Sequence, residues 1–276
     1  MISIILVNYY SDCDIVKHID NFKDNSFFRI IVVDNSDTLD FIDFSNVIIL
    51  KPKENLGYAG GNNLAYNYEI ELYPDNCMFV LNPDVTISID SIIEMYNFIS
   101  KVITIGQVYA CAVDEFGNKL YDSINLSGLS QTWNDSSDEK SFIPSDYAAG
   151  SAFMFYPNRL KQKHLFDERY FLYWEEVDLS LRFRNNNLEI YCYKRNSCIR
   201  KTNSLQSIVN SLYYLSRNSF IINRQHCLTS LYGHISYILS LYRQSLRVAY
   251  VSKSLLPIVQ VSYGLLHGIL GKTGRK

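Results

Sequence analysis

The stretch CMFVLNPD, residues 77–84, joins an apolar run to a polar ending. An unbroken apolar run of this length is typical of a strand that is covered on both faces of a sheet. Pro83 cannot continue the hydrogen-bond ladder of a sheet, so we expect the strand to stop there. Asp84 would then lie exposed at the carboxyl end of the strand. An acid in an ordinary turn is the alternative.

Outward from this stretch, apolar runs alternate with polar segments that can form helices. The predicted strands are 2–8, 29–33, 47–50 and 77–81. Three helices are predicted between them: one at 12–22, one of about ten residues that follows the glycines near residue 60, and one at 89–100 with Ser88 as its cap. This rhythm predicts an α/β fold with a mostly parallel central sheet and a ligand crevice at the carboxyl ends of its strands. After residue 108 the pattern predicts an antiparallel portion, a helix at 178–185 and a last strand at 190–193. Beyond residue 204 everything is predicted helical.

Composition sets the broad class of the protein. The chain has 276 residues, 47% hydrophobic and 14% aromatic, enough to bury a sizeable core in one large domain or one domain plus an appendage. Six scattered cysteines without a Cys-x-x-Cys pair indicate reduced thiols rather than a zinc site or a disulfide framework. The first apolar run lacks a basic flank and is short for a signal peptide, so we interpret it as a strand.

Charge is distributed unevenly along the chain. The first 189 residues hold all 28 acidic residues and 14 of the 26 basic ones, whereas residues 190–276 hold the other 12 basic residues and no acid. A basic tail predicts an anionic partner. Because the tail has long apolar stretches at 228–242 and 255–270, amphipathic helices lying on lipid are favoured over nucleic-acid binding or membrane spans. Packing on the protein's own core or in a homo-oligomer is the alternative.

A second acidic station follows aromatic residues later in the chain. Glu175, Glu176 and Asp178 come directly after Trp174. Burial and like-charge neighbours raise the pKa of a carboxylate, which suits a general base that takes a proton from a hydroxyl. Aromatic faces nearby suit sugar stacking. The plainer interpretation is that a helix dipole favours acids at its N-terminus.

Two weaker signals concern a nucleotide. Asp34 ends the second strand, where a carboxylate in an α/β fold can accept hydrogen bonds from a base or ribose, although a turn explains it equally well. The glycine-rich segment around Gly57 and Gly61 precedes a predicted helix, where backbone could approach a phosphate or simply turn tightly. No Gly-x-Gly-x-x-Gly follows Asn8 and Tyr9, which argues against an NAD enzyme.

Taken together, these segments resemble the family 2 glycosyltransferases, an inverting class with the GT-A fold. Within the family the chain looks most similar to bacterial rhamnosyltransferase-type enzymes of surface polysaccharide synthesis. The matching segments, which cover nearly the whole chain in order, are 3–9, 32–36, 54–63, 81–85, 149–152, 166–182, 213–218 and 264–272.

The resemblance implies a role for each matching position. Glu176 would be the general base, with Glu175 and Asp178 beside it, in a Glu-Glu pair where relatives usually have Glu-Asp or Asp-Asp. Asp84 would hold Mg²⁺ or Mn²⁺. Arg200 stands where relatives often carry a metal-binding His, so it would bind the diphosphate directly or weaken the metal dependence. The implied donor-binding residues are Asn8, Tyr9, Asp34, Asn55, Gly57, Gly61, Asn82 and Arg200, and the implied acceptor-binding residues are Gly150, Trp174 and Glu175.

The resemblance also implies an organisation and a setting. Residues 1–203 would form the GT-A catalytic domain, with a nucleotide-binding half to about 105 and an acceptor-binding half from 106, and residues 204–276 a basic helical extension. The expected reaction moves rhamnose from dTDP-rhamnose, or a hexose from a UDP-sugar, onto a lipid-linked glycan at the cytoplasmic face of a bacterial inner membrane. A nucleotidyltransferase is disfavoured, because no basic Gly-rich loop follows the first strand. A non-catalytic sugar-nucleotide-binding or membrane-assembly module is the remaining alternative.

Overall fold

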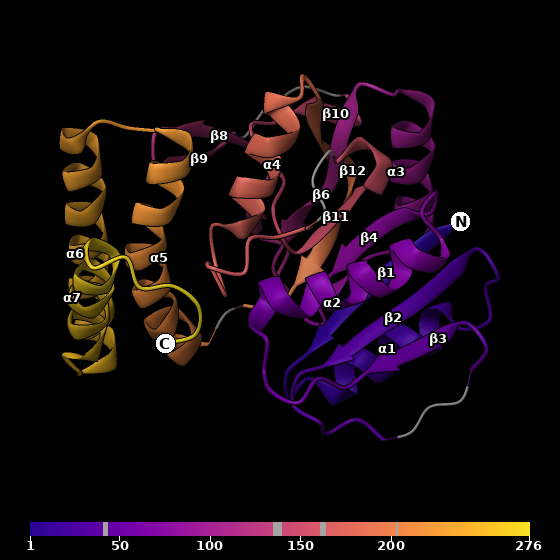
Figure 1. The fold of residues 1–276 in the computed structure, drawn as a ribbon, viewed down its shortest axis with the longest axis horizontal. Coiled ribbons are helices and arrows are strands. Elements are labelled where there is room, and N and C mark those ends of the chain that lie inside the picture. The colour runs from indigo at the N-terminus through magenta and orange to yellow at the C-terminus, as the bar shows by residue number, and fades with distance from the viewer. Residues whose placement is uncertain (41–43, 135–139, 161–163, 203) are drawn as a thin grey trace.

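The computed structural model describes residues 1–276 except 41–43, 135–139, 161–163 and 203. Its centre is a ten-stranded sheet with the order β10-β12-β6-β11-β4-β1-β2-β3, in which β5 also pairs with β12 and β7 with β6 (Figure 1). The strands are β1 (Ile2–Asn8), β2 (Phe28–Asp34), β3 (Val47–Leu50), β4 (Cys77–Leu81), β5 (Val85–Thr86), β6 (Ile105–Val113), β7 (Lys119–Tyr121), β10 (Phe142–Pro144), β11 (Ala152–Phe155) and β12 (Glu189–Arg200). A separate hairpin consists of β8 (Ser123–Ser127) and β9 (Ser130–Asn134).

The N-terminal half is the parallel part of the sheet. β1 pairs in parallel with both β2 and β4, and β2 pairs in parallel with β3. All five residues of β4 are buried, as its apolar run predicted. α1 (Asp12–Phe22) and α2 (Gly57–Leu72) contact β1 and β2, and α3 (Ile89–Lys101) contacts β6 and β11. The carboxyl ends of β1, β2 and β4 therefore open at one edge of the sheet.

The second half mixes strand directions, as predicted. β11 runs antiparallel between β4 and β6, while β12 is parallel to β6. A 3-10 helix at Pro157–Arg159 follows β11, and α4 (Glu175–Asn185) contacts β6 and β12. The prediction of an α/β fold with a mostly parallel central sheet is confirmed.

Three helices form the C-terminal part, as the sequence predicted. α5 (Leu205–His226), α6 (Leu231–Ser252) and α7 (Leu256–Ile269) stand together beside the sheet (Figure 1). They share a small apolar core of Leu212, Ile238, Leu241 and Val261, while Ile221 and Ile222 of α5 belong to the main core. After α7 the chain turns back as a non-helical segment, residues 270–276 (Figure 1). None of the helices among the described residues combines the length and apolar character that crossing a membrane requires.

Three element boundaries differ from the sequence prediction. α2 starts at Gly57 itself and runs for 16 residues, so the glycines lie inside the helix rather than before it. Gly57 has a φ of +71°, and a side chain there would collide with the Phe171 ring, which explains the glycine. α4 begins at Glu175, and β12 extends from Glu189 to Arg200 because register shifts let it follow β6 further.

Candidate active site

A cavity of about 500 Å³ lies at the carboxyl ends of β1 and β4, and we call it the Asp84 cavity. Five residues that the sequence proposed for donor or metal binding meet in its wall: Tyr9, Asn55, Gly57, Asn82 and Asp84. Val7, Asn35, Pro83, Phe171, Tyr214 and residues of the C-terminal part also line it. The sheet edge that was expected to bind a ligand is thus hollow, with both polar and aromatic walls.

Asn8 and Asp34 lie at the same edge but do not line this cavity. Both side chains are fully buried. The Asn8 amide donates to the Asp34 carboxylate at 2.8 Å and to Asp12 at 2.6 Å, and the second Asp34 oxygen accepts from the Leu39 N–H at 2.9 Å. These bonds hold the ends of β1 and β2 together, so the two residues shape the cavity edge, and Tyr9 and Asn35 face the space itself.

Arg200 is the partner of Asp84. The Arg200 Nε lies 3.5 Å from Asp84 Oδ2, and both side chains are about one-third exposed or less, 27% and 34%. Pairing of β5 with the end of β12 sets this distance, since Val85 lies opposite Arg200. Lys201 fixes the same strand end to α1 through Asp14, at 2.6 Å. The guanidinium therefore stands at the carboxylate that was proposed to bind a metal.

A second cavity of about 450 Å³ contains the proposed base, and we call it the Glu176 cavity. Its wall includes Tyr121, Trp133, Tyr147, Gly150, Glu176 and Arg200. Arg200 connects the two cavities, because it lines this one and contacts Asp84 of the other. Tyr58 connects them as well, since it lines the Asp84 cavity and its hydroxyl donates to the carbonyl of Gly150. Asp84 and Glu176 thus face adjoining spaces.

Glu175 is buried and Glu176 is half-buried, and one carboxylate oxygen of each is buried without a hydrogen-bond partner in the described part of the chain. The Oε2 atoms of Glu175 and Glu176 make no hydrogen bond to the described residues. Burial raises the pKa of Glu175 well above its usual range, and the charge of Glu176 adds to this effect. Burial also raises the pKa of Glu176, although backbone hydrogen bonds and the Arg200 charge oppose it. A carboxylate in this state accepts a proton more readily than an exposed glutamate does.

The backbone before α4 is strained, and side chains of α5 hold it in place through hydrogen bonds. Phe171, Tyr173 and Trp174 have φ values of 63°, 66° and 78°, which residues other than glycine rarely adopt. Asn218 of α5 donates to the carbonyls of Tyr170, Leu172 and Tyr173 at 2.8–3.0 Å. The fully buried Arg217 donates to the Tyr170 carbonyl at 2.7 Å and also to that of Arg169. Helix α5 therefore fixes the turn that delivers Glu175 and Glu176.

Like Asn8, Asp34 and Glu175, three further predicted site residues line neither the Asp84 cavity nor the Glu176 cavity. Gly61 is buried, with no room for a side chain between Val7 and Asn35, so it serves helix–strand packing rather than ligand approach. Trp174 is only 2% exposed and packs edge-on against Tyr237 at 5.8 Å, so it offers no free face to a sugar. Asp178 is on another face of α4.

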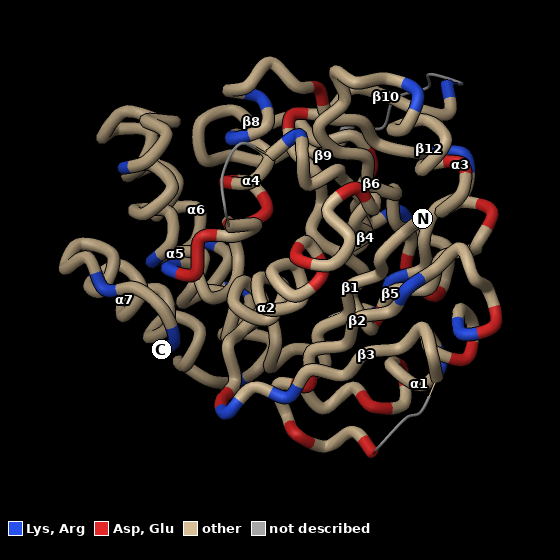
Figure 2. Tube along the Cα trace, turned by 45° about the vertical axis from the view of Figure 1, so that its right-hand side comes forward, with Lys and Arg blue, Asp and Glu red and all other residues tan. Residues whose placement is uncertain are grey.

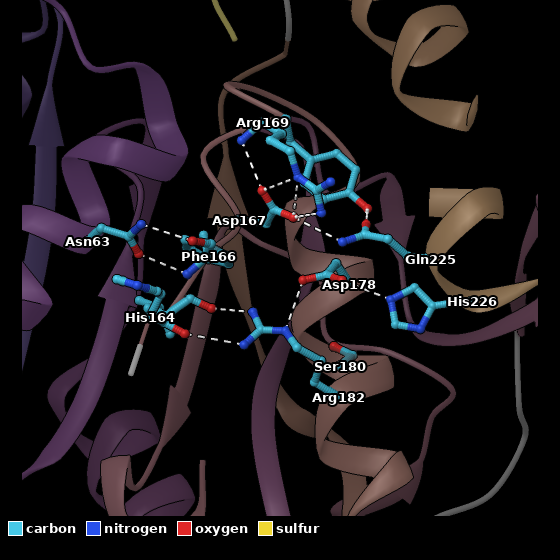
Figure 3. Close-up of polar contacts among 12 residues, drawn as sticks. Asn63, His164, Phe166, Asp167, Arg169, Asp178, Ser180, Arg182, Gln225 and His226 are labelled. Carbon is cyan, nitrogen blue, oxygen red and sulfur yellow. Dashed lines mark hydrogen bonds and ion pairs between the residues drawn. The ribbon is translucent and has the colours of Figure 1, made fainter. Parts of the chain in front are cut away.

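The surroundings of Asp178 are a polar bracing network (Figure 3). Its carboxylate accepts from Arg182 Nε at 2.9 Å and contacts His226 Nε2 at 2.8 Å. Arg182 donates in turn to the carbonyls of His164 and Leu165. This network lines a separate cavity of about 640 Å³, which contains neither Asp84 nor Glu176. Asp178 thus joins α4, α5 and the chain before α4.

The sequence analysis missed several residues of the two cavities. Trp133 of β9 is 49% exposed and lines the Glu176 cavity, but a tryptophan at one hairpin position carries no local signal of its use. The sequence analysis attributed the segment around Tyr58 to its glycines and gave the tyrosine no role. Arg275 and Lys276 line the Asp84 cavity although they lie nearly two hundred residues after Asp84.

Comparison with solved structures of glycosyltransferases shows that this architecture is the GT-A fold. GalNAc-T7, whose crystal structure contains UDP, GalNAc and Mn²⁺, matches with a TM-score of 0.55 at 11% identity, over 80% of this chain and 50% of its own. Residues 1–349 of TarS from S. aureus match with a TM-score of 0.52 at 12% identity, over 99% of this chain and 93% of the other. The predicted GT-A fold is confirmed, and the chain spans half the length of the GalNAc-T7 chain.

In sequence the chain is similar to a named hexosyltransferase. The low-salt glycan biosynthesis hexosyltransferase Agl10 of Haloferax volcanii is 26% identical over 294 residues, which cover 99% of this chain and 92% of the relative. No protein-family model matches the chain. The relative agrees with the predicted enzyme class, glycosyltransferase. Neither it nor the two structures is named a rhamnosyltransferase, so the donor sugar stays a prediction.

Proposed function

We propose that the protein is an inverting glycosyltransferase, which moves a sugar from a nucleotide-diphosphate sugar to an acceptor hydroxyl. One observation carries this proposal: Glu176, whose Oε2 has no hydrogen-bond partner among the described residues, lines a cavity that it shares with Arg200, and Arg200 also contacts Asp84 of the neighbouring cavity. A displacement at the anomeric carbon needs a base and a phosphate-binding edge close together.

In the proposed reaction Glu176 removes the proton of the acceptor hydroxyl. The acceptor oxygen then forms a bond to the anomeric carbon from the face opposite the diphosphate, and the bond between that carbon and the diphosphate oxygen breaks. The nucleoside diphosphate leaves with the bonding electron pair, and the configuration at carbon is inverted. Tyr58 and Tyr147 line the two cavities, and such aromatic walls would limit competition from water, which would otherwise hydrolyse the donor.

A divalent cation fits the Asp84 cavity only together with substrate. No cluster of three or more His, Cys, Asp or Glu side chains that could hold a metal occurs among the described residues. Mg²⁺ commonly uses one or two carboxylates and completes its shell with phosphate oxygens and water, and Asp84 can supply one carboxylate. When bound, such an ion would neutralise charge on the leaving diphosphate. Because Arg200 already neutralises Asp84, we propose that metal dependence is partial.

The sequence resemblance and the compared proteins favour different donors. The resemblance of the sequence favours dTDP-rhamnose, whereas the relative named hexosyltransferase and the UDP in the GalNAc-T7 structure support a hexose on UDP. Tyr9, Asn35 and Asn55 would contact the nucleoside, and Asn82 and Asp84 the diphosphate side. We keep residues 1–203 as the proposed catalytic domain, with donor contacts mostly before 105 and acceptor contacts from 106.

The acceptor is proposed to be a glycan on a lipid carrier, reached from the cytoplasmic face of a membrane. Gly150 and Trp133 border the Glu176 cavity, so an acceptor sugar could stack on the exposed indole face. The α6–α7 pair exposes large apolar side chains, among them Leu231, Tyr232, Leu246, Tyr250, Val251 and Leu255. In Figure 2 this part of the molecule carries basic residues and no acidic ones. Such a surface suits anionic lipid, to which each basic residue contributes on the order of 1 kcal/mol.

The membrane proposal has a direct test in sedimentation with anionic liposomes. Arg243, Arg247 and Lys253 lie on or next to α6, and their replacement by Gln should reduce sedimentation with vesicles that contain phosphatidylglycerol. A protein that stays in the supernatant regardless of vesicle charge, and instead elutes as a dimer, would favour the homo-oligomer.

The enzymatic proposal is tested by incubating the protein with a panel of UDP- and dTDP-sugars, with membrane extract as the acceptor source. Acceptor-dependent release of UDP or dTDP supports a glycosyltransferase. Release of inorganic pyrophosphate from a nucleoside triphosphate and a sugar phosphate would identify a nucleotidyltransferase instead. Binding of a donor without turnover under every acceptor condition would identify the non-catalytic module.

A further inference from the structure

Two basic residues from the C-terminal end of the chain line the Asp84 cavity. Among the described residues that line this cavity, the charged ones are Asp84, Arg275 and Lys276. The wall of the cavity therefore combines one acid at the sheet edge with two basic residues of the segment after α7. A nucleoside diphosphate carries its charge on the phosphates, so this wall is the natural place for them.

The segment 271–276 is built into the structure rather than resting on it. Gly274 donates its N–H to the Arg169 carbonyl at 2.8 Å, and its own carbonyl accepts from the buried guanidinium of Arg217. Gly271 and Gly274 have φ values of +71° and +75°, which permit the reversal after α7. The segment is thus held by the same Arg217 that fixes the turn before Glu175.

Lys276 is anchored, whereas Arg275 is free to bind. The Lys276 ammonium donates to Gln260 at 2.6 Å and lies 5.0 Å from the centre of the Tyr213 ring. The backbone N–H of Lys276 donates to the Tyr214 hydroxyl at 3.2 Å. Arg275 is exposed and makes no hydrogen bond or ion pair with another described residue. Its charge is close enough to Tyr214 to lower the pKa of that hydroxyl, which burial as the larger effect raises.

We propose that Arg275 and Lys276 form a wall of the donor-binding site and that Arg275 binds the diphosphate of the nucleotide, with Lys276 as its anchor. The proposal rests on the proposed glycosyltransferase function and adds a binding residue to it. Arg275 presents a planar fork of N–H donors, which suits two phosphate oxygens at once. Together with Arg200, which contacts Asp84, it would supply positive charge that many sites obtain from a metal alone.

Titration calorimetry with UDP and dTDP tests the proposal, with uridine and thymidine as probes that lack phosphate. Arg275→Ala should weaken the diphosphate that the wild type binds by about tenfold or more, because a hydrogen bond to a charged group is typically worth at least that factor. Affinity for the nucleoside should not change. Arg275→Lys should recover part of the loss. The matched control is Lys272→Ala, which removes the same charge from the same segment at a residue outside the cavity wall.

The outcomes distinguish failure of the proposed Arg275 role from failure of the proposed glycosyltransferase function. Equal affinity of wild type and Arg275→Ala for the diphosphate would overturn the role of Arg275 while leaving the glycosyltransferase proposal intact. An equal loss for diphosphate and nucleoside would also overturn it, since that pattern indicates collapse of the wall. A wild type that binds neither UDP nor dTDP would reject both proposals. The thermal midpoint should stay unchanged in every variant, because both substituted side chains are exposed.

Discussion

The Arg200 guanidinium lies 3.5 Å from the Asp84 carboxylate, and the same guanidinium lines the cavity of Glu176. One side chain therefore touches the residue proposed to hold a cation and borders the space of the proposed base. The resemblance to family 2 glycosyltransferases predicts a metal-binding histidine at the position of Arg200. The pair thus places a fixed positive charge where a cation was expected.

Replacement of Arg200 by His should convert partial metal dependence into strict dependence. Without the guanidinium, Asp84 is free and the imidazole can act as a second ligand. We expect the wild type to keep a measurable share of its donor binding in EDTA, and Arg200→His to lose at least tenfold under the same conditions and to regain it with Mn²⁺. Thermal shift with sugar nucleotides measures both. If wild-type binding vanishes in EDTA, Arg200 does not substitute for the cation.

Replacement of Glu176 by Gln should lower turnover by about 10²–10⁴-fold, the usual contribution of a general base, while donor binding survives. The raised pKa of Glu176 also sets the pH dependence. Because the base works only when deprotonated, wild-type kcat/KM should fall as the pH drops through a midpoint above 4.5, the ordinary value for this carboxyl. A pH–rate profile that stays flat to pH 4.5, or an active Gln variant, would refute the assignment.

Replacement of Glu175 by Gln should stabilise the protein at neutral and alkaline pH. Burial raises the pKa of Glu175 in the folded state, so the native protein binds its proton more tightly than the unfolded chain does. Stability from this group is therefore present at low pH and is lost as the pH rises from the ordinary value toward the raised one. Each unit of that shift is worth about 1.4 kcal/mol.

The measurement for Glu175→Gln is thermal unfolding at pH 8 and at pH 4. The variant should unfold at a higher temperature than the wild type at pH 8. The difference should shrink at pH 4, where the side chain of residue 175 is neutral in the folded wild type as well as in the variant. A variant that is less stable at pH 8 would show that the ionised Glu175 has a partner in solution.

Replacement of Asn218 by Ala should damage both stability and turnover. The variant removes three hydrogen bonds to the carbonyls of Tyr170, Leu172 and Tyr173. The Tyr170 carbonyl keeps its bond from Arg217, but the part-buried carbonyls of Leu172 and Tyr173 lose this donor, which should lower the free energy of unfolding by about 3 kcal/mol. The strained turn would relax and displace Glu176, so kcat should fall more than donor affinity. The control is Gln206→Ala, at an exposed residue of the same helix. It should change neither the free energy of unfolding nor kcat.

Replacement of Trp133 by Ala should raise the KM for the acceptor roughly tenfold without changing donor affinity, because the indole lines the Glu176 cavity and does not line the Asp84 cavity. With half of its surface exposed, the residue should contribute little to the unfolding free energy. Trp133→Phe should retain part of the affinity. Unchanged acceptor KM in Trp133→Ala would exclude the stacking platform.

The parallel half of the sheet could be predicted from the sequence because its strands are locally encoded. The apolar runs of β1, β3 and β4 have the predicted bounds, and Pro83 ends β4 as expected. Asp84 lies at the predicted edge because the end of a strand determines its position. The helical tail was also foreseeable from its pattern.

The parts that the sequence did not predict depend on distant contacts. The burial of Asp34 follows from its bonds to Asn8 and Leu39, and that of Trp174 from packing on Tyr237, and neither neighbour could be known in advance. The return of the tail to the Asp84 cavity depends on Arg217, which is 57 residues from Gly274. Trp133 reaches the Glu176 cavity only because β8 and β9 pair as a hairpin.

The buried Arg217 guanidinium donates to the carbonyl of Gly274 and also to the carbonyl of Tyr170. One side chain thus fastens both the segment that carries Arg275 and the turn that precedes Glu175. We therefore expect donor binding at Arg275 and the position of the proposed base to be mechanically coupled through this single guanidinium.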